Sequence, residues 1–101
     1  MAERKIRLTP VHPGEILRED FMAPLTLSIN ALARSLRVPA NHISGIVNEK
    51  RGITARTALR LARYFGTSPE LWLGLQLDYE LDVAKDTVSA QIDKEVLPRA
   101  S

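Results

Sequence analysis

The chain has 101 residues, 45% of them hydrophobic, and no cysteine. This length suits one domain and is too short for two independent cores. The missing cysteines exclude a disulfide framework, thiolate zinc sites and cysteine nucleophiles. No stretch approaches the ~20 consecutive apolar residues of a membrane helix, and no apolar segment follows the charged first residues as in a secretory signal. We therefore expect a cytoplasmic protein that does not associate with a membrane.

The net charge of +2 hides an uneven distribution. Residues 28–66 contain seven basic residues and one acidic residue, whereas residues 67–101 contain three basic and seven acidic residues. A basic segment of this kind fits a polyanion such as nucleic acid, although charged runs are also typical of solvated helix faces. The acidic segment would be repelled by DNA, so we expect it to face away from DNA and to meet another partner.

Two helices are predicted in the first part of the chain. The first begins at Pro13, because proline suits the first helical position, and His12 is expected to cap it or to pack locally. It ends near Ala23, because Pro24 disfavours a helical conformation of the residue before it. The second begins after Ser28, a good N-cap, and carries apolar residues at i, i+3, i+4 and i+7 on one face.

Three further helices are predicted along the chain. Pro39 ends the second helix and opens a third, so that only residues 37–38 separate the two. This arrangement is typical of a helix-turn-helix. The fourth helix runs from the N-cap Thr54 to Gly66, which suits a left-handed C-terminal cap. The fifth begins after the N-cap Ser68, with proline and glutamate in its first turn.

The predicted fold class is all-α, a compact bundle of five to six helices. Residues 1–84 would form the helix-turn-helix domain including its fifth helix, and residues 85–101 a C-terminal extension. Val88, Ile92 and Val96 lie four residues apart. This spacing is compatible with a separate final helix that meets either a second copy or another partner.

The exposed face of the third helix carries the strongest indication of function. At about 100° per residue, its apolar side chains gather on one side, and the opposite side holds only small neutral residues. A helix that only had to be soluble would carry Lys and Glu there. A helix that enters the major groove needs short side chains and amide or hydroxyl groups that meet base edges. Asn41 is the strongest candidate, because asparagine can bond both N6 and N7 of adenine.

A second set of residues is expected to hold phosphates and to fix the register of the protein on DNA without reading sequence. It combines the start of the second helix, whose N–H groups attract anions, with polar and basic residues of the third helix, the turn after it and the start of the fourth. His42 would neighbour a phosphate or a base edge, or be simply exposed. The set is Ser28, Asn30, His42, Asn48, Lys50, Arg51 and Arg56.

The fifth helix carries apolar residues around most of its circumference, more than one small core requires. Burial on two sides implies a second chain, unless the other four helices simply wrap this one. A two-fold dimer would match the two half-sites of a palindromic operator. Trp72 is expected in the core. The residues expected at the dimer interface are Leu71, Leu75, Tyr79 and Leu81.

No feature of the sequence indicates an enzyme, a cofactor or a metal site. His12 and His42, the two histidines, belong to different segments and have no acid–base partner. Asp78 and Asp82 share a helix face, but Glu80 points away from it, so a metal ion would meet only two ligands. A glycine-rich phosphate loop is also absent.

Several motifs together resemble HigA-type antitoxins of the Cro/repressor (XRE) helix-turn-helix superfamily over about residues 12–84. They are HPGEIL near the start, LA in the second helix, NEKRGIT after the third, and TALRLARYFGTSPELWLGLQ. The family often has glycine where this chain has Glu49, which would alter the phosphate geometry at that turn.

The resemblance implies a lambda-repressor-like fold and a dimer that binds the operator of its own operon. It also implies a partner, a HigB-type toxin that is a ribosome-dependent endoribonuclease and that the antitoxin neutralises. Gly45 has no side chain with which to read a base, so specificity must depend on the other members of the base-contacting set. By the resemblance, this set is Pro39, Ala40, Asn41, Ser44 and Gly45.

Three functions stay open at this point. The first is a DNA-binding antitoxin of a type II toxin–antitoxin system that represses its own operon. The second is a stand-alone transcriptional regulator of the same family, which only an adjacent reading frame for a small basic ribonuclease would distinguish from the first. The third is a protein-interaction module without DNA binding. It predicts acidic or bulky residues on the exposed face of the third helix, where the sequence has none.

Overall fold

The computed structural model describes residues 9–100, and these residues form helices without any strand. The all-α prediction is therefore confirmed for this part of the chain, and the first helix consists of two consecutive pieces, α1 and η1. The elements are α1 (Pro13–Ile16), η1 (Leu17–Met22), α2 (Ile29–Leu36), α3 (Ala40–Val47), α4 (Ala55–Phe65) and α5 (Pro69–Glu95).

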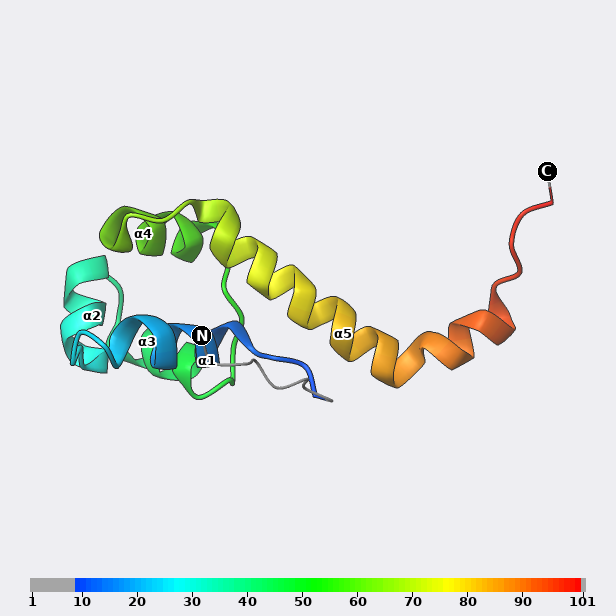
Figure 1. Cartoon of the computed structure of the whole chain (residues 1–101), viewed down its shortest axis with the longest axis horizontal. Helices are drawn as coiled ribbons and strands as arrows, with labels where there is room; N and C mark the ends of the chain where they lie inside the picture. Colours follow the sequence, from blue (N-terminus) through cyan, green and yellow to red (C-terminus); the bar gives the residue numbers. More distant parts are fainter. Residues whose placement is uncertain (1–8, 101) are drawn as a thin grey trace, which may run out of the picture.

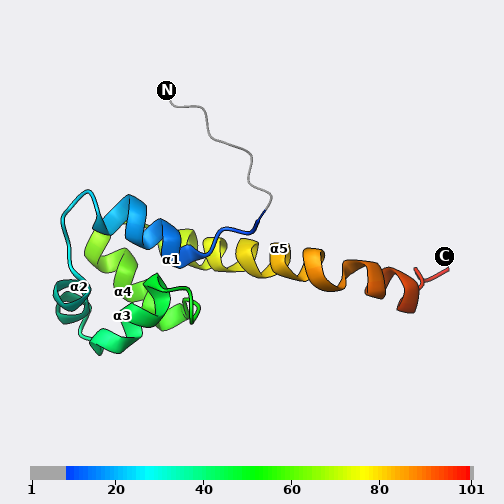
Figure 2. The same ribbon diagram turned by 90° about the horizontal axis from the view of Figure 1, so that it is seen from below.

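The helices form a small body from which half of one helix projects. The first half of α5 packs against α1 and α4, and its second half leaves the body at the end opposite α2 (Figures 1 and 2). The radius of gyration is 16.6 Å, against the ~13 Å of a compact chain of this length. The predicted helical bundle is confirmed, and the projecting half of α5 makes the chain more extended than a compact bundle. Residues 85–95 are helical, as expected, but they continue α5 without a break instead of forming a further helix.

Side chains at the predicted N-caps start three of the helices. Ser28, Thr54 and Ser68 each accept a hydrogen bond from the backbone N–H three residues further on, at 3.0, 3.4 and 3.1 Å. Gly66 ends α4 with a φ of 75°, the left-handed conformation expected of it. These predictions are confirmed, because capping depends on residues that are adjacent in the chain.

The helix η1 ends where predicted, but for a different reason. The helix stops near Met22 as expected, but Ala23 keeps helical angles of −60° and −47°. The N–H of Ala23 donates to the carbonyl of Arg18 at 3.0 Å, a bond that spans five residues and gives the turn its π-helical width. Pro24 ends this pattern because it has no N–H to donate, and the conformation of the residue before it is unchanged.

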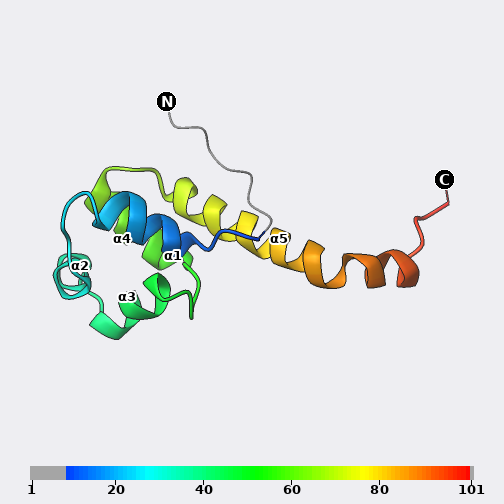
Figure 3. The same cartoon turned by 60° about the horizontal axis from the view of Figure 1, so that its bottom comes forward.

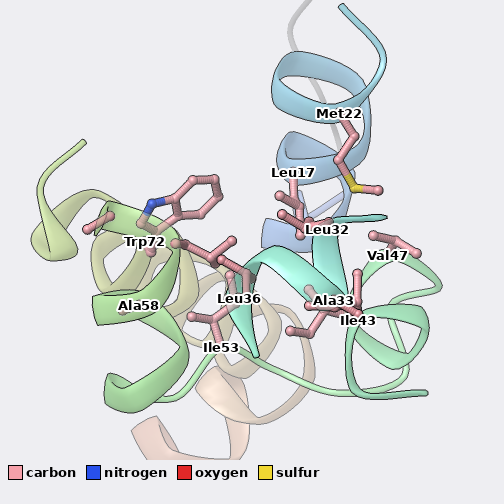
Figure 4. Packing of buried hydrophobic residues seen from close by; sticks show 13 residues of the cluster. Leu17, Met22, Leu32, Ala33, Leu36, Ile43, Val47, Ile53, Ala58 and Trp72 are labelled. Carbon is pink, nitrogen blue, oxygen red and sulfur yellow. The ribbon is translucent and has the colours of Figure 1, made fainter. Parts of the chain in front are cut away.

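One hydrophobic core lies between the helices of the body. Trp72 is completely buried, as predicted, and its indole N–H donates to the hydroxyl of Thr67 at 2.8 Å. Figure 4 shows Trp72 on one side of the core and Val47 of α3 on the other. The buried hydrophobic residues are Leu17, Met22, Leu32, Ala33, Leu36, Ile43, Ile46, Val47, Ile53, Ala58, Leu61, Ala62 and Trp72.

The start of α1 packs directly on the backbone of α3. A Cβ atom at Gly14 would lie 1.8 Å from the carbonyl oxygen of Ile46, so only glycine allows this approach. His12 caps α1, as predicted, because its Nδ1 accepts a hydrogen bond from the N–H of Gly14 at 2.8 Å. The same imidazole lies edge-on to the ring of Tyr79, with centroids 4.7 Å apart. His12 therefore joins α1 to α5 beside the contact that holds α3.

His12 should make the stability of the protein depend on pH. Its burial lowers the pKa of the imidazole, and the nearby Glu49 opposes this only in part. As pH falls below ~6.5, the unfolded chain therefore binds the proton before the folded one does. The stabilising contribution is present above that pH and is lost as pH falls through the folded pKa. We expect urea denaturation to give a lower free energy of unfolding at about pH 5.5 than at about pH 7.5.

A His12→Asn variant provides the control for this prediction. Asparagine can accept the same capping hydrogen bond but does not titrate, so the difference in unfolding free energy between the two pH values should shrink. The pH dependence that remains would include His42, whose pKa is also lowered by burial. An undiminished difference in the variant would contradict the assignment to His12.

Candidate nucleic-acid interface

One side of α3 packs into the core, and the other side faces solvent. Ile43, Ile46 and Val47 are buried, whereas the opposite side is free of charged side chains. The residues expected to contact bases lie together here: Pro39, Ala40 and Asn41 are exposed, and Ser44 and Gly45 are half-buried. Figure 3 shows α2 and α3 along one edge of the body, away from the free half of α5. The fold therefore presents a small neutral surface beside basic segments.

The turn after α3 is tight and folds back on the helix. Glu49 has a φ of 62°, a left-handed conformation that costs roughly 1–2 kcal/mol in a residue other than glycine. This explains why glycine suits this position. The N–H groups of Lys50 and Arg51 both donate to the carbonyl of Gly45, at 2.8 and 3.2 Å. These bonds hold the backbone of the first basic residues after α3 against the C-terminal end of the helix.

Arg18 is a residue of the site that the sequence analysis missed. Its guanidinium donates a hydrogen bond to the carbonyl of Val47, which is an otherwise unpaired group at the C-terminal end of α3. It also lies 3.8 Å from the carboxylate of Glu49. The sequence carries one indication of this contact. Arg18 lies four residues after Gly14, so both residues are on the side of the first helix that meets α3.

His42 lies between α3 and α4. A hydrogen bond of 3.0 Å joins its Nε2 to the hydroxyl of Thr57, a buried residue. Burial and, to a lesser degree, the positive charge of Arg51 lower the pKa of His42, which favours a neutral imidazole that can accept this bond. The expectation that His42 could be simply exposed is wrong, because the ring is half-buried against α4.

The remaining residues expected to hold phosphates are exposed. The hydroxyl oxygen of Ser28 is used in capping α2, and the amide of Asn48 donates to the hydroxyl of Ser44 at 3.1 Å. The other members have no hydrogen bond or ion pair from their side chains to residues 9–100: Asn30, Lys50, Arg51 and Arg56. These side chains can therefore reach a ligand without breaking an existing contact.

The structure divides the four residues expected at a dimer interface. Leu71 and Leu81 are exposed, whereas Leu75 packs partly buried against the core and Tyr79 contacts His12. The difference arises because α1 and α4 cover one side of the first half of α5. Other large residues of α5 are exposed on the same side as Leu81. They are Leu77, which the prediction did not name, and Val88 and Ile92, whose spacing already suggested contact with a second copy or another partner.

Within residues 9–100, no three His, Cys, Asp or Glu side chains lie close enough together to hold a metal ion. In the same range, none of the helices has the length and apolar character that crossing a bilayer requires.

Comparisons with known proteins agree with this geometry. The helix-turn-helix family model HTH_3 matches residues 17–72. Virulence-associated protein I of Dichelobacter nodosus is 51% identical over 80% of this chain and 75% of its own length. Antitoxin HigA-1 of Vibrio cholerae is 37% identical over 72% of this chain and 69% of its own.

A solved structure of a related antitoxin has the same fold. It is the Pseudomonas aeruginosa antitoxin HigA with the higBA promoter, which superposes with a TM-score of 0.88 at 46% sequence identity. The match covers 90% of this chain and 99% of the other. The chain therefore belongs to the helix-turn-helix family and, within it, to the HigA-type antitoxins.

Proposed function

We propose that this protein is a sequence-specific DNA-binding antitoxin that represses its own operon and neutralises a HigB-type toxin. The observation that carries this function is the exposed, uncharged side of α3 between basic segments. A related antitoxin of the same fold has been solved with promoter DNA. We assign no catalytic step to this chain, because His12 and His42 both make structural contacts. Because related proteins come from bacteria, where operator DNA lies in the cytoplasm, we place this protein in the cytoplasm.

Two sets of residues divide the work on DNA. The exposed residues of α3 read bases in the major groove, and Asn41 bonds an adenine. Ser28, Asn30, Lys50 and Arg56 hold phosphates on either side and set the register of the protein. Because each phosphate contact releases a counterion, binding depends strongly on salt, whereas the preference for a base at one position does not.

Asn41→Ala and Lys50→Ala test this division of labour. Asn41→Ala should relax the preference at one base pair, at a cost of ~1–3 kcal/mol. Lys50→Ala should weaken binding to all sequences alike and reduce the slope of log affinity against log salt by ~1. Fluorescence anisotropy with the upstream region of the gene, point-substituted versions of it and random DNA, at two salt concentrations, measures both quantities. Equal effects of the two variants on specific and random DNA would contradict the proposal.

A dimer presents two copies of α3 to the two half-sites of an operator, ~34–36 Å apart. The residues up to 84 then form the DNA-binding unit and the first part of the dimer contact, which residues 85–101 continue. We place the dimer contact on the apolar side of α5 that faces away from the body, because Leu77, Leu81, Val88 and Ile92 are 39–56% exposed there. Their spacing of four, seven and four residues puts them on one side of the helix. Large exposed apolar patches of this kind mark sites of contact with another protein.

Leu81→Asp should convert the dimer to a monomer, because it introduces a charge at the centre of this stripe. Sedimentation velocity should give a mass near 11.3 kDa for the variant and twice that for the original protein. Leu25→Asp is the matched control, since Leu25 is 60% exposed in the turn after η1. A Leu81→Asp protein that remains dimeric would rule out this interface.

The acidic residues of α5 provide a surface to which a basic toxin can bind. Asp78, Asp82 and Asp86 are exposed on the helix that leaves the body away from α2, so they do not oppose the phosphates at α3. A basic ribonuclease would find complementary charge there. The second candidate, a stand-alone regulator, rests on the same DNA-binding surface. A neighbouring reading frame whose product co-purifies with this protein would decide for the antitoxin.

A further inference from the structure

The side chain of Arg51 fills the place that Gly45 leaves empty. A Cβ atom built on Gly45 would lie 2.6 Å from Cδ and 3.0 Å from Cγ of Arg51. The aliphatic part of this arginine therefore lies across the glycine, where the side chain of an ordinary residue would begin. Glycine inside a helix costs about 1 kcal/mol relative to alanine, and the close approach of Arg51 gives this cost a structural reason.

The backbone fixes the point from which Arg51 starts. Its N–H and that of Lys50 share the carbonyl of Gly45 as acceptor, and the left-handed Glu49 reverses the chain just before them. The space beside Gly45, which has no side chain, is thus filled by the side chain of Arg51 from the turn that follows the helix. With the stem packed, less conformational freedom is lost when the guanidinium binds a ligand.

The guanidinium itself is free to bind. Arg51 is exposed, and its side chain makes no hydrogen bond or ion pair with residues 9–100. After burial, which is the larger cause, the positive charge of Arg51 contributes to the lowered pKa of His42 in α3. Gly45 lies four residues after Asn41, so both positions point to the same side of α3. The stem of Arg51 therefore lies on the side of α3 that carries the proposed adenine contact, and the guanidinium extends from there.

From this placement we propose that Arg51 reads a guanine in the major groove and thereby takes the role of the side chain that Gly45 lacks. The planar guanidinium can donate two hydrogen bonds to O6 and N7 of guanine, which is the commonest specific contact between an arginine and DNA. The inference rests on the proposed DNA binding and reassigns Arg51 from the residues that hold phosphates to those that read sequence.

Three variants test this role by selection of binding sites from a randomised operator library. Arg51→Ala should lose the preference for guanine at one position in each half-site, by about 5- to 150-fold. Arg51→Lys keeps the positive charge but lacks the planar group with two parallel donors. It should therefore lose the same preference for guanine, while the salt dependence of binding stays unchanged. Arg56→Ala is the matched control, because Arg56 is an exposed arginine at the start of α4 and its loss should weaken all sequences equally.

Gly45→Ala tests the positioning of Arg51 independently. The new methyl group displaces a flexible side chain while alanine favours the helix, so the variant should fold and yet lose the guanine preference. In the Gly45→Ala, Arg51→Ala double variant this preference should fall no further than in Arg51→Ala alone. Circular dichroism spectra of the variants are the control that shows whether each of them is folded.

The possible outcomes separate the inference from the proposed function. If Arg51→Ala weakens all sequences alike and keeps the guanine preference, Arg51 only holds a phosphate and the inference is overturned. If Gly45→Ala keeps the preference that Arg51→Ala loses, the packing of the two residues has no role in recognition, which also overturns it. If the original protein selects no sequence at all, the proposed function itself fails.

Discussion

The position of α3 is the constraint on which the rest of the structure depends. Its inner side is buried in the core, and α1 touches its backbone through Gly14. Two hydrogen bonds add to this packing, one from Arg18 to the last turn of the helix and one between His42 and Thr57 of α4. Because other elements hold the helix, its outer side needs no stabilising charges. That side is therefore available for groups that meet base edges.

Charge is arranged around α3 according to distance from DNA. The neutral residues of the helix are suited to base edges, and the basic residues beside it supply the attraction to phosphates. The acidic residues lie mainly on α5, whose second half extends from the body away from α2 (Figure 1). Exposed charges further apart than ~8 Å are largely screened at physiological salt, so acidic residues on the projecting half of α5 should oppose DNA binding little.

Local features of the fold were predictable from the sequence, and long-range contacts were not. The caps at Ser28, Thr54 and Ser68 involve only neighbouring residues, and the periodicity of α3 separates its buried from its exposed side. The partner of His42 is fifteen residues away, and nothing in the local pattern indicates it. Periodicity likewise shows that α5 is apolar on two sides, but only the structure shows which side α1 and α4 already cover.

The insertion of α3 into DNA can be measured directly, because the chain has no cysteine. A Ser44→Cys variant carries a single thiol on the proposed reading surface, and Leu25→Cys carries one in the turn after η1. With operator DNA at saturating concentration, alkylation of the thiol at position 44 should slow by an order of magnitude or more, and alkylation at position 25 should not change. Equal rates at position 44 with and without the operator would contradict the account.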